Sequence, residues 1–141
     1  MFDRHGTDRI AAWKQFRDKL ETSEHPLEAV AELWSHAPFV GHYLDPHSPQ
    51  QWPNPWQLVI DLRLDDLAIA LGMLYTIKLT QRFIDSKCEI HKSMLPNNLE
   101  PSFYLVVDQQ HVMNYEPRLV HSIDVLDNVQ TNTLWCCDQR L

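Results

Sequence analysis

Residues 64–79 read LDDLAIALGMLYTIKL, in which two acids precede a run without any charged side chain at positions 68–77. A helix that lacks a charged face has to be surrounded by protein on nearly all sides. We therefore expect a buried central helix, capped by Asp65 or Asp66, because a carboxylate there meets unpaired N–H groups and the helix dipole. Gly72 in mid-helix costs roughly 1 kcal/mol relative to alanine. Its presence indicates that another element approaches closely.

Two shorter helices are expected upstream of this central helix. Asp8 can cap the first, and Pro26 suits the first position of the second, so residues 1–44 are predicted to form a helical hairpin. Residues 45–56, DPHSPQQWPNPW, hold four prolines and are expected to form a loop, because each proline restricts itself and the residue before it. Residues 57–84 then hold a short helix and the central one.

The periodicity becomes strand-like in residues 87–126. KCEIHKSML (87–95) alternates, FYLVV is an apolar run of β-forming residues, HVMNY follows after DQQ, and LVHSIDVL adds a possible fourth strand. Helices followed by an antiparallel sheet indicate the α+β class. We predict one domain over residues 1–141, with a buried helix packed on three or four antiparallel strands and a tail at 127–141.

The composition argues against several classes of partner. A net charge of −7 and a pI near 5.5 disfavour nucleic acid or an anionic membrane, which require clustered Lys and Arg. The chain holds three glycines far apart and hence no phosphate-binding loop, so no small-molecule cofactor is expected. Three cysteines give no disulfide framework and fit a reducing compartment of synthesis. No apolar run is long enough to cross a bilayer.

The stretch Leu64-Asp65-Asp66-Leu67-Ala68 before the sheet resembles the transglutaminase-like branch of papain-type folds. In that family a Cys-x-Asp-x-Ala pattern opens the central helix, a histidine lies on a following core strand, and an Asp-Pro follows on the next. The resemblance covers residues 58–124. It places Leu64 where the thiol should be, matches Asp66, gives Tyr104 in the region of the histidine, and aligns Glu116 with the aspartate.

The resemblance implies a catalytic site that has lost its thiol and its imidazole. Thiol catalysis needs a thiolate, an imidazole and a group that orients the imidazole, so we predict no catalytic residues and no enzyme. The alternative is a small cysteine-dependent hydrolase or acyltransferase with a rearranged site built on Cys88 and His91. Strand residues three apart point to opposite faces, which argues against that pair.

Metal binding is not predicted either. His36, His42 and His47 cluster with Asp45, and Cys136-Cys137 are adjacent, but neither spacing matches a zinc signature. Surface histidines and a packed apolar tail are the plainer interpretations.

The functional prediction is therefore a non-enzymatic structural or assembly protein that binds other protein subunits. QWPNPWQLVID and the uncharged helix after it resemble uncharacterised proteins of large tailed bacteriophages. The resemblance implies a virion component of the tail, baseplate or neck, synthesised in the host cytoplasm. A regulatory module of an intracellular complex is the other possibility. Tryptophan is enriched at binding hot spots, and the predicted contact residues are Trp52, Trp56, Leu134 and Trp135. Trp52 and Trp56 folding back onto the core is the alternative.

Overall fold

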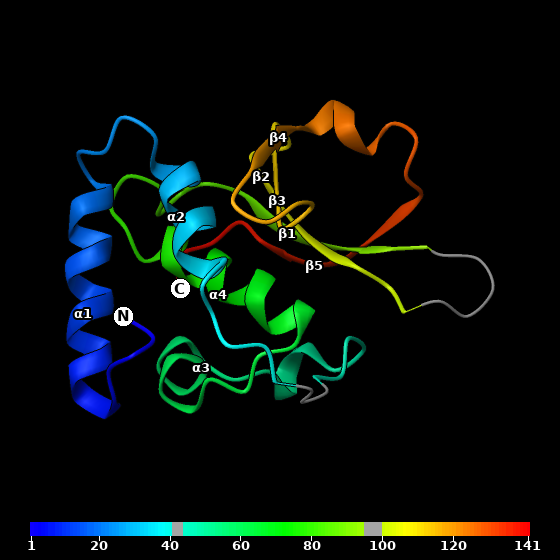
Figure 1. Ribbon diagram of the computed structural model, residues 1–141. Helices are drawn as coiled ribbons and strands as arrows, with labels where there is room; N and C mark the ends of the chain where they lie inside the picture. Colours follow the sequence, from blue (N-terminus) through cyan, green and yellow to red (C-terminus); the bar gives the residue numbers. More distant parts are fainter. Residues whose placement is uncertain (41–43, 95–99) are drawn as a thin grey trace.

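The computed structural model describes residues 1–40, 44–94 and 100–141 (Figure 1). Helices come first along the chain and strands afterwards, which confirms the α+β class. The helices are α1 (Gly6–Leu20), α2 (Pro26–Trp34), α3 (Pro55–Asp61) and α4 (Asp66–Lys78), with 3-10 turns η1 (Pro49–Gln51) and η2 (Ile123–Leu126). The strands are β1 (Cys88–Ser93), β2 (Phe103–Val107), β3 (His111–Met113), β4 (Val120–Ser122) and β5 (Thr131–Cys137).

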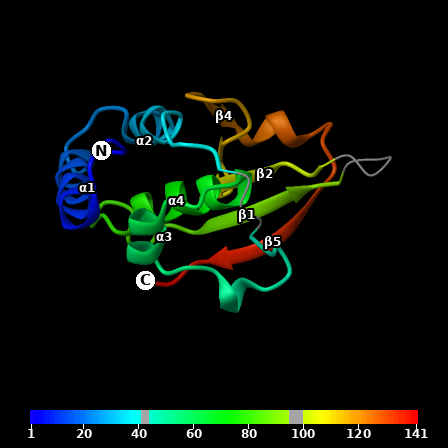
Figure 2. The ribbon, with the colours of Figure 1, turned by 60° about the horizontal axis from the view of Figure 1, so that its bottom comes forward.

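The sheet has five antiparallel strands in the order β4-β3-β2-β1-β5. The sequence predicts three or four strands and a tail at residues 127–141, so β5 is a correction. It was missed because its pairing with β1 is long-range, Cys88 lying opposite Cys137. In Figure 2, β5 runs beside β1 along one edge of the sheet and leads back to the C-terminus. Leu95, placed in the first expected strand, lies outside the described residues.

Helix α4 is the centre of the molecule and packs on the sheet through β1 and β2, with α2 and α3 beside it. Most of its side chains are buried, as expected for a helix without a charged face. Asp65 caps it by accepting a hydrogen bond from the backbone N–H of Ala68 at 2.8 Å. Its other carboxylate oxygen accepts from the N–H of Leu44 at 2.9 Å, which fixes the end of α4 to the loop that precedes η1.

Gly72 lets an indole ring reach the backbone of α4. A Cβ atom built at this position would lie 2.3 Å from Cη2 of Trp34, on α2. The Trp34 indole donates to Oγ1 of Thr76 at 3.0 Å, and so does the indole of Trp13 from α1, also at 3.0 Å. The Thr76 hydroxyl in turn donates to the carbonyl of Gly72 at 2.7 Å. One buried hydroxyl thus joins three helices.

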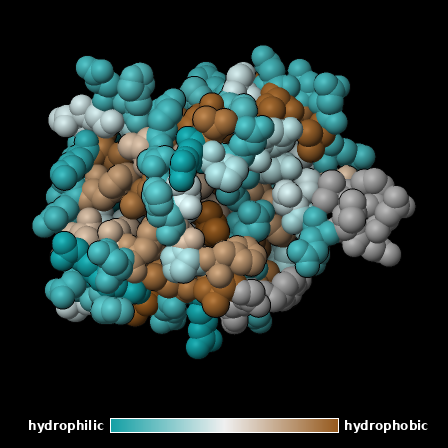
Figure 3. Space-filling model, viewed as in Figure 1, coloured by the Kyte–Doolittle hydropathy of each residue, from teal (hydrophilic) through white to brown (hydrophobic). Residues whose placement is uncertain are grey.

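The other face of the sheet carries a second, smaller apolar cluster. Tyr104, Val106 and Val112 form it, and side chains from η2 and the residues after it cover it. Figure 1 shows this orange segment crossing the sheet on the side away from α4. In Figure 3, apolar side chains gather over the centre of the face shown, whereas hydrophilic ones dominate its α1 side. None of the helices described is long and apolar enough for a membrane span.

Candidate functional site

A cleft of about 490 Å³ opens where the N-terminus of α4 meets the start of β2. Apolar side chains form much of its surface, and five ionisable groups interrupt them. It is lined by Phe39, Leu44, Pro46, His47, Asp65, Asp66, Lys92, Glu100, Pro101 and Phe103. Binding sites are typically concave, mostly apolar and supplied with a few convergent polar groups, so this cleft is the candidate functional site.

Asp66 is the first residue of α4, and its partly buried carboxylate lines the cleft. One carboxylate oxygen accepts a hydrogen bond from the backbone N–H of Phe103 at 2.8 Å, and the other accepts from Nδ2 of Asn114 at 3.1 Å. The Asn114 amide also donates to the carbonyl of Phe103 at 2.9 Å. Burial raises the pKa of Asp66, although both hydrogen bonds act to lower it.

Asn114 reaches Asp66 because the chain turns sharply at the end of β3. Its φ of +65° lies in the left-handed region, which asparagine tolerates better than most residues. The turn carries the side chain back past Phe103, at the start of β2, toward α4. The residues that open α4, begin β2 and follow β3 thus meet at one point.

The three residues that meet at this point offer different chemical groups. Asp66 occupies the helix start, Phe103 supplies a backbone amide and an apolar ring, and Asn114 supplies an amide. Among the described residues that line the cleft there is no thiol, and its imidazole belongs to His47. The arrangement can bind an apolar ligand, and Asp66 can accept or donate a proton; within the described lining it offers no sulfur nucleophile.

Of the positions aligned from the sequence, the cleft contains only Asp66. Leu64 is fully buried in the main core, and Tyr104 packs on the opposite face of the sheet. Glu116 is half exposed and lies 3.7 Å from His121. On β2 the prediction named Tyr104, whereas the residue that lines the cleft is Phe103. Successive strand side chains point to opposite faces of the sheet, so Phe103 faces α4 and Tyr104 faces away from it.

The tryptophans predicted as contact residues fall into two groups. Trp52 and Trp135 stack edge to face with ring centroids 5.6 Å apart, and the Trp52 indole donates to the carbonyl of Asp45 at 2.8 Å. Trp135 and Leu134 lie on β5 and pack partly against the core. Trp56, which is 44% exposed, packs on Trp13 instead. These four residues therefore form no single surface.

The alternative Cys88–His91 pair does not form. Cys88 is fully buried in the main core, and burial raises its pKa to about 12. The imidazole of His91 lies against Thr131 and Thr133 of β5, and burial lowers its pKa. Across residues 1–40, 44–94 and 100–141, no three His, Cys, Asp or Glu side chains are placed to hold a metal ion. His42 lies outside these ranges.

Comparison with solved structures identifies a similar fold. Calcium-bound LapG of Legionella pneumophila, a transglutaminase-like cysteine protease domain, superposes with a TM-score of 0.69 over 92% of this chain and 75% of that chain, at 14% sequence identity. No protein-family model matches the sequence. No curated protein matches it significantly.

This similarity of fold corrects the prediction about enzyme activity and supports the predicted transglutaminase-like fold. The prediction that the chain is not an enzyme is wrong, because the similar fold is that of a cysteine protease and points to an enzyme fold. The resemblance to bacteriophage proteins gains no support from the comparison. What the likeness shows is the fold, and the chain has a distant version of the transglutaminase-like fold.

Proposed function

We propose that the protein binds an extended polypeptide segment in the cleft at the N-terminus of α4. The observation that carries this proposal is the position of the cleft, directly in front of Asp66 at the start of α4, the central helix of a fold similar to that of a cysteine protease. Phe39, 69% exposed at the rim, and Phe103 inside offer apolar contacts for side chains. Lys92 and Glu100 offer charges of both signs to a peptide backbone or its ends.

The test uses fluorescein-labelled peptides of randomised sequence and measures fluorescence anisotropy. The expected result is saturable binding that Phe39→Ser weakens at least tenfold, because the exposed ring contributes apolar contact at the rim. Leu119→Ser is the matched control, since Leu119 is 48% exposed and does not line the cleft. Binding that is absent from the folded wild type, or equally weakened in both variants, would contradict the proposal.

A second candidate is hydrolysis of the bound chain, favoured by the buried carboxyl group of Asp66. Ionisable groups with shifted pKa values in a cleft are typical of acid–base catalysis. No cysteine is among the described residues that line the cleft, and the carboxyl group of Asp66 can take a proton from an attacking water there. Quenched fluorescent peptides test this. Hydrolysis should rise with pH as Asp66 ionises and should fall at least a hundredfold in Asp66→Asn, while peptide binding persists.

The proposals on partners and location rest on the sequence alone. Other protein subunits remain the proposed partners, with Trp52, Trp56, Leu134 and Trp135 as proposed contacts; the exposure of Trp56 favours it most among them. A virion location is tested by mass spectrometry of purified particles. Absence of the protein from particles whose host lysate contains it would remove that proposal.

A further inference from the structure

Two thiols lie opposite each other where the β1–β5 ladder ends. Cys88 begins β1, Cys137 ends β5, and the register pairs them. Both side chains belong to the core on the helix side of the sheet. Directly opposed residues of antiparallel strands have Cα atoms about 4.5 or 5.5 Å apart. Both values fall within the range of roughly 4.4–6.8 Å that disulfides span. We propose that Cys88 and Cys137 form a reversible disulfide that ties β5 to β1.

The two sulfur atoms differ in access. Cys137 is 8% exposed and lines an open pocket of about 360 Å³ formed by residues 135–141, whereas Cys88 is fully buried behind it. A small thiol reagent can therefore reach Cys137 from solvent and cannot reach Cys88 directly. The position of Cys137 at the end of the ladder also favours disulfide formation. The residues after Cys137 have no further pairing with β1, so they can shift and let the two sulfur atoms approach.

The oxidant is a low-molecular-weight disulfide, such as oxidised glutathione. The Cys137 thiolate attacks one of its sulfur atoms, and the first glutathione leaves as a thiolate that takes up a proton. The Cys88 thiolate then attacks the sulfur of Cys137 in the mixed disulfide and releases the second glutathione. The protein loses two hydrogen atoms, and one disulfide outside the protein becomes two thiols. Reduced glutathione reverses both steps.

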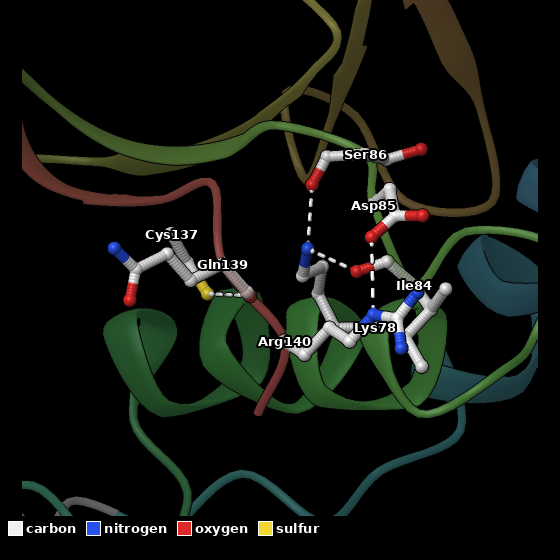
Figure 4. Close-up of polar contacts among 7 residues, drawn as sticks. All are labelled: Lys78, Ile84, Asp85, Ser86, Cys137, Gln139 and Arg140. Atoms are coloured by element: carbon white, nitrogen blue, oxygen red, sulfur yellow. Dashed lines mark hydrogen bonds and ion pairs between the residues drawn. The ribbon is translucent and has the colours of Figure 1, made fainter.

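A buried ammonium group stands beside this pair. Lys78 reaches from α4 to the carbonyls of Ile84 and Ser86, at 2.8 and 2.7 Å, as Figure 4 shows. Its positive charge acts to lower the pKa of both thiols, against the burial that raises each of them. A neighbouring cation stabilises the attacking thiolate. The Sγ of Cys137 donates to the carbonyl of Gln139 at 3.4 Å, and this bond has to break during exchange.

Cys136 provides the internal comparison. It is exposed and pairs with Glu89 in the register, so its side chain points to the other face of the sheet. It can form a mixed disulfide with glutathione but cannot reach Cys88. Formation of the proposed disulfide should therefore depend on Cys137 and be independent of its exposed neighbour.

The experiment treats the full chain with glutathione buffers of increasing oxidised fraction, quenches with acid, and alkylates free thiols under denaturing conditions. Intact mass and tandem mass spectrometry then locate the link. Cys136→Ser is included because adjacent cysteines are hard to separate by proteolysis. The expected result is a Cys88–Cys137 bridge in wild type and in Cys136→Ser, and none in Cys137→Ser. Circular dichroism verifies that each variant is folded.

Four results would overturn the proposal. One is a bridge that contains Cys136. Another is glutathionylation of Cys136 with Cys88 and Cys137 both still free. The third is a Cys136→Ser chain that stays fully reduced in buffers oxidising enough to form ordinary structural disulfides. A bridge that forms but resists reduced glutathione would overturn its reversibility.

Discussion

The side-chain amide of Asn114 donates to the carboxylate of Asp66 at 3.1 Å, across the ends of two elements that are far apart in the chain. This bond, with the one from the N–H of Phe103, fixes an acid in the first turn of α4, beside the start of β2. The site is consequently a connected set of hydrogen bonds, and the loss of Asp66 affects both partners.

Replacing Asp66 with alanine should destabilise the fold by about 1–3 kcal/mol, because the N–H of Phe103 loses its acceptor in a partly buried site. Urea unfolding measures the difference. Asp18→Ala is the control, since Asp18 is 62% exposed and pairs with Lys14 on the same helix. An equal, small effect of both substitutions would contradict the structural role of Asp66.

The same carboxyl group should make stability depend on pH. Because burial raises the pKa of Asp66 above 3.8 in the folded state, the folded protein holds this proton more tightly than the unfolded chain. Its contribution to the unfolding free energy is therefore fully present below pH 3.8 and is lost as the pH rises through the folded-state pKa. Unfolding of Asp66→Asn, measured over the same pH series, should lack this decline; parallel curves would refute it.

Gly72→Ala should destabilise the protein although alanine is the better helix former. The new methyl group would lie 2.3 Å from the Trp34 ring, and overpacking of this kind costs about 1–3 kcal/mol, more than the roughly 1 kcal/mol gained in helix propensity. In a double-mutant cycle, Trp34→Leu should remove the penalty. A penalty that persists in the Trp34→Leu background would show that the indole is not its cause.

Substituting Asp66→Cys together with Phe103→His should create a reactive thiol. The pair would place sulfur at the start of α4 and imidazole on β2, with the Asn114 amide already beside both positions. A thiol next to imidazole and a helix N-terminus has a pKa lowered to roughly 3.5–7.5. Alkylation near neutral pH should exceed that of Asp66→Cys alone by about tenfold. Equal rates would mean that the two side chains do not meet.

In the native chain, thiol reagents should distinguish the three cysteines. Cys136 is exposed and should react first, whereas Cys88 is fully buried with a pKa raised to about 12. Labelling of Cys88 should require unfolding or strongly alkaline solution. Time-resolved alkylation followed by peptide mass spectrometry checks the order. Selective labelling of Cys88 at neutral pH would restore the alternative of a cysteine-dependent hydrolase.

Trp52 and Trp135 should be energetically coupled. Their edge-to-face contact, with centroids 5.6 Å apart, predicts a coupling of about 0.5–1.5 kcal/mol beyond area burial in a double-mutant cycle to alanine. Trp56, which contacts Trp13 instead, supplies the control cycle with Trp135 and should show additive effects. Additivity of Trp52 with Trp135 would mean that the contact contributes no stability.

The buried central helix could be predicted from the sequence, whereas the residues of the candidate site could not, apart from Asp66. An uncharged helix has to be buried, and Asp65 precedes it in a capping position, so the central role of α4 could be predicted. The hydrogen bond between Asn114 and Asp66 could not be predicted from the sequence. It depends on the left-handed backbone of Asn114 after β3 and on packing between segments that are far apart in the chain. The resemblance stated from the sequence pointed to Leu64, Tyr104 and Glu116 beside Asp66, and it did not include Phe103 or Asn114. Alternation on β2 could have pointed to Phe103.

The hydroxyl of Thr76, which accepts hydrogen bonds from Trp13 and Trp34 at once, ties the fluctuations of the helices to one another. Local unfolding of α4 would break both of these hydrogen bonds, because they share the Thr76 hydroxyl as their acceptor. A displacement of α1 or α2 away from α4 would break one of them. We therefore expect α1, α2 and α4 to unfold as one cooperative unit in native-state hydrogen exchange. The backbone amides of these three helices should share a common, slow exchange rate.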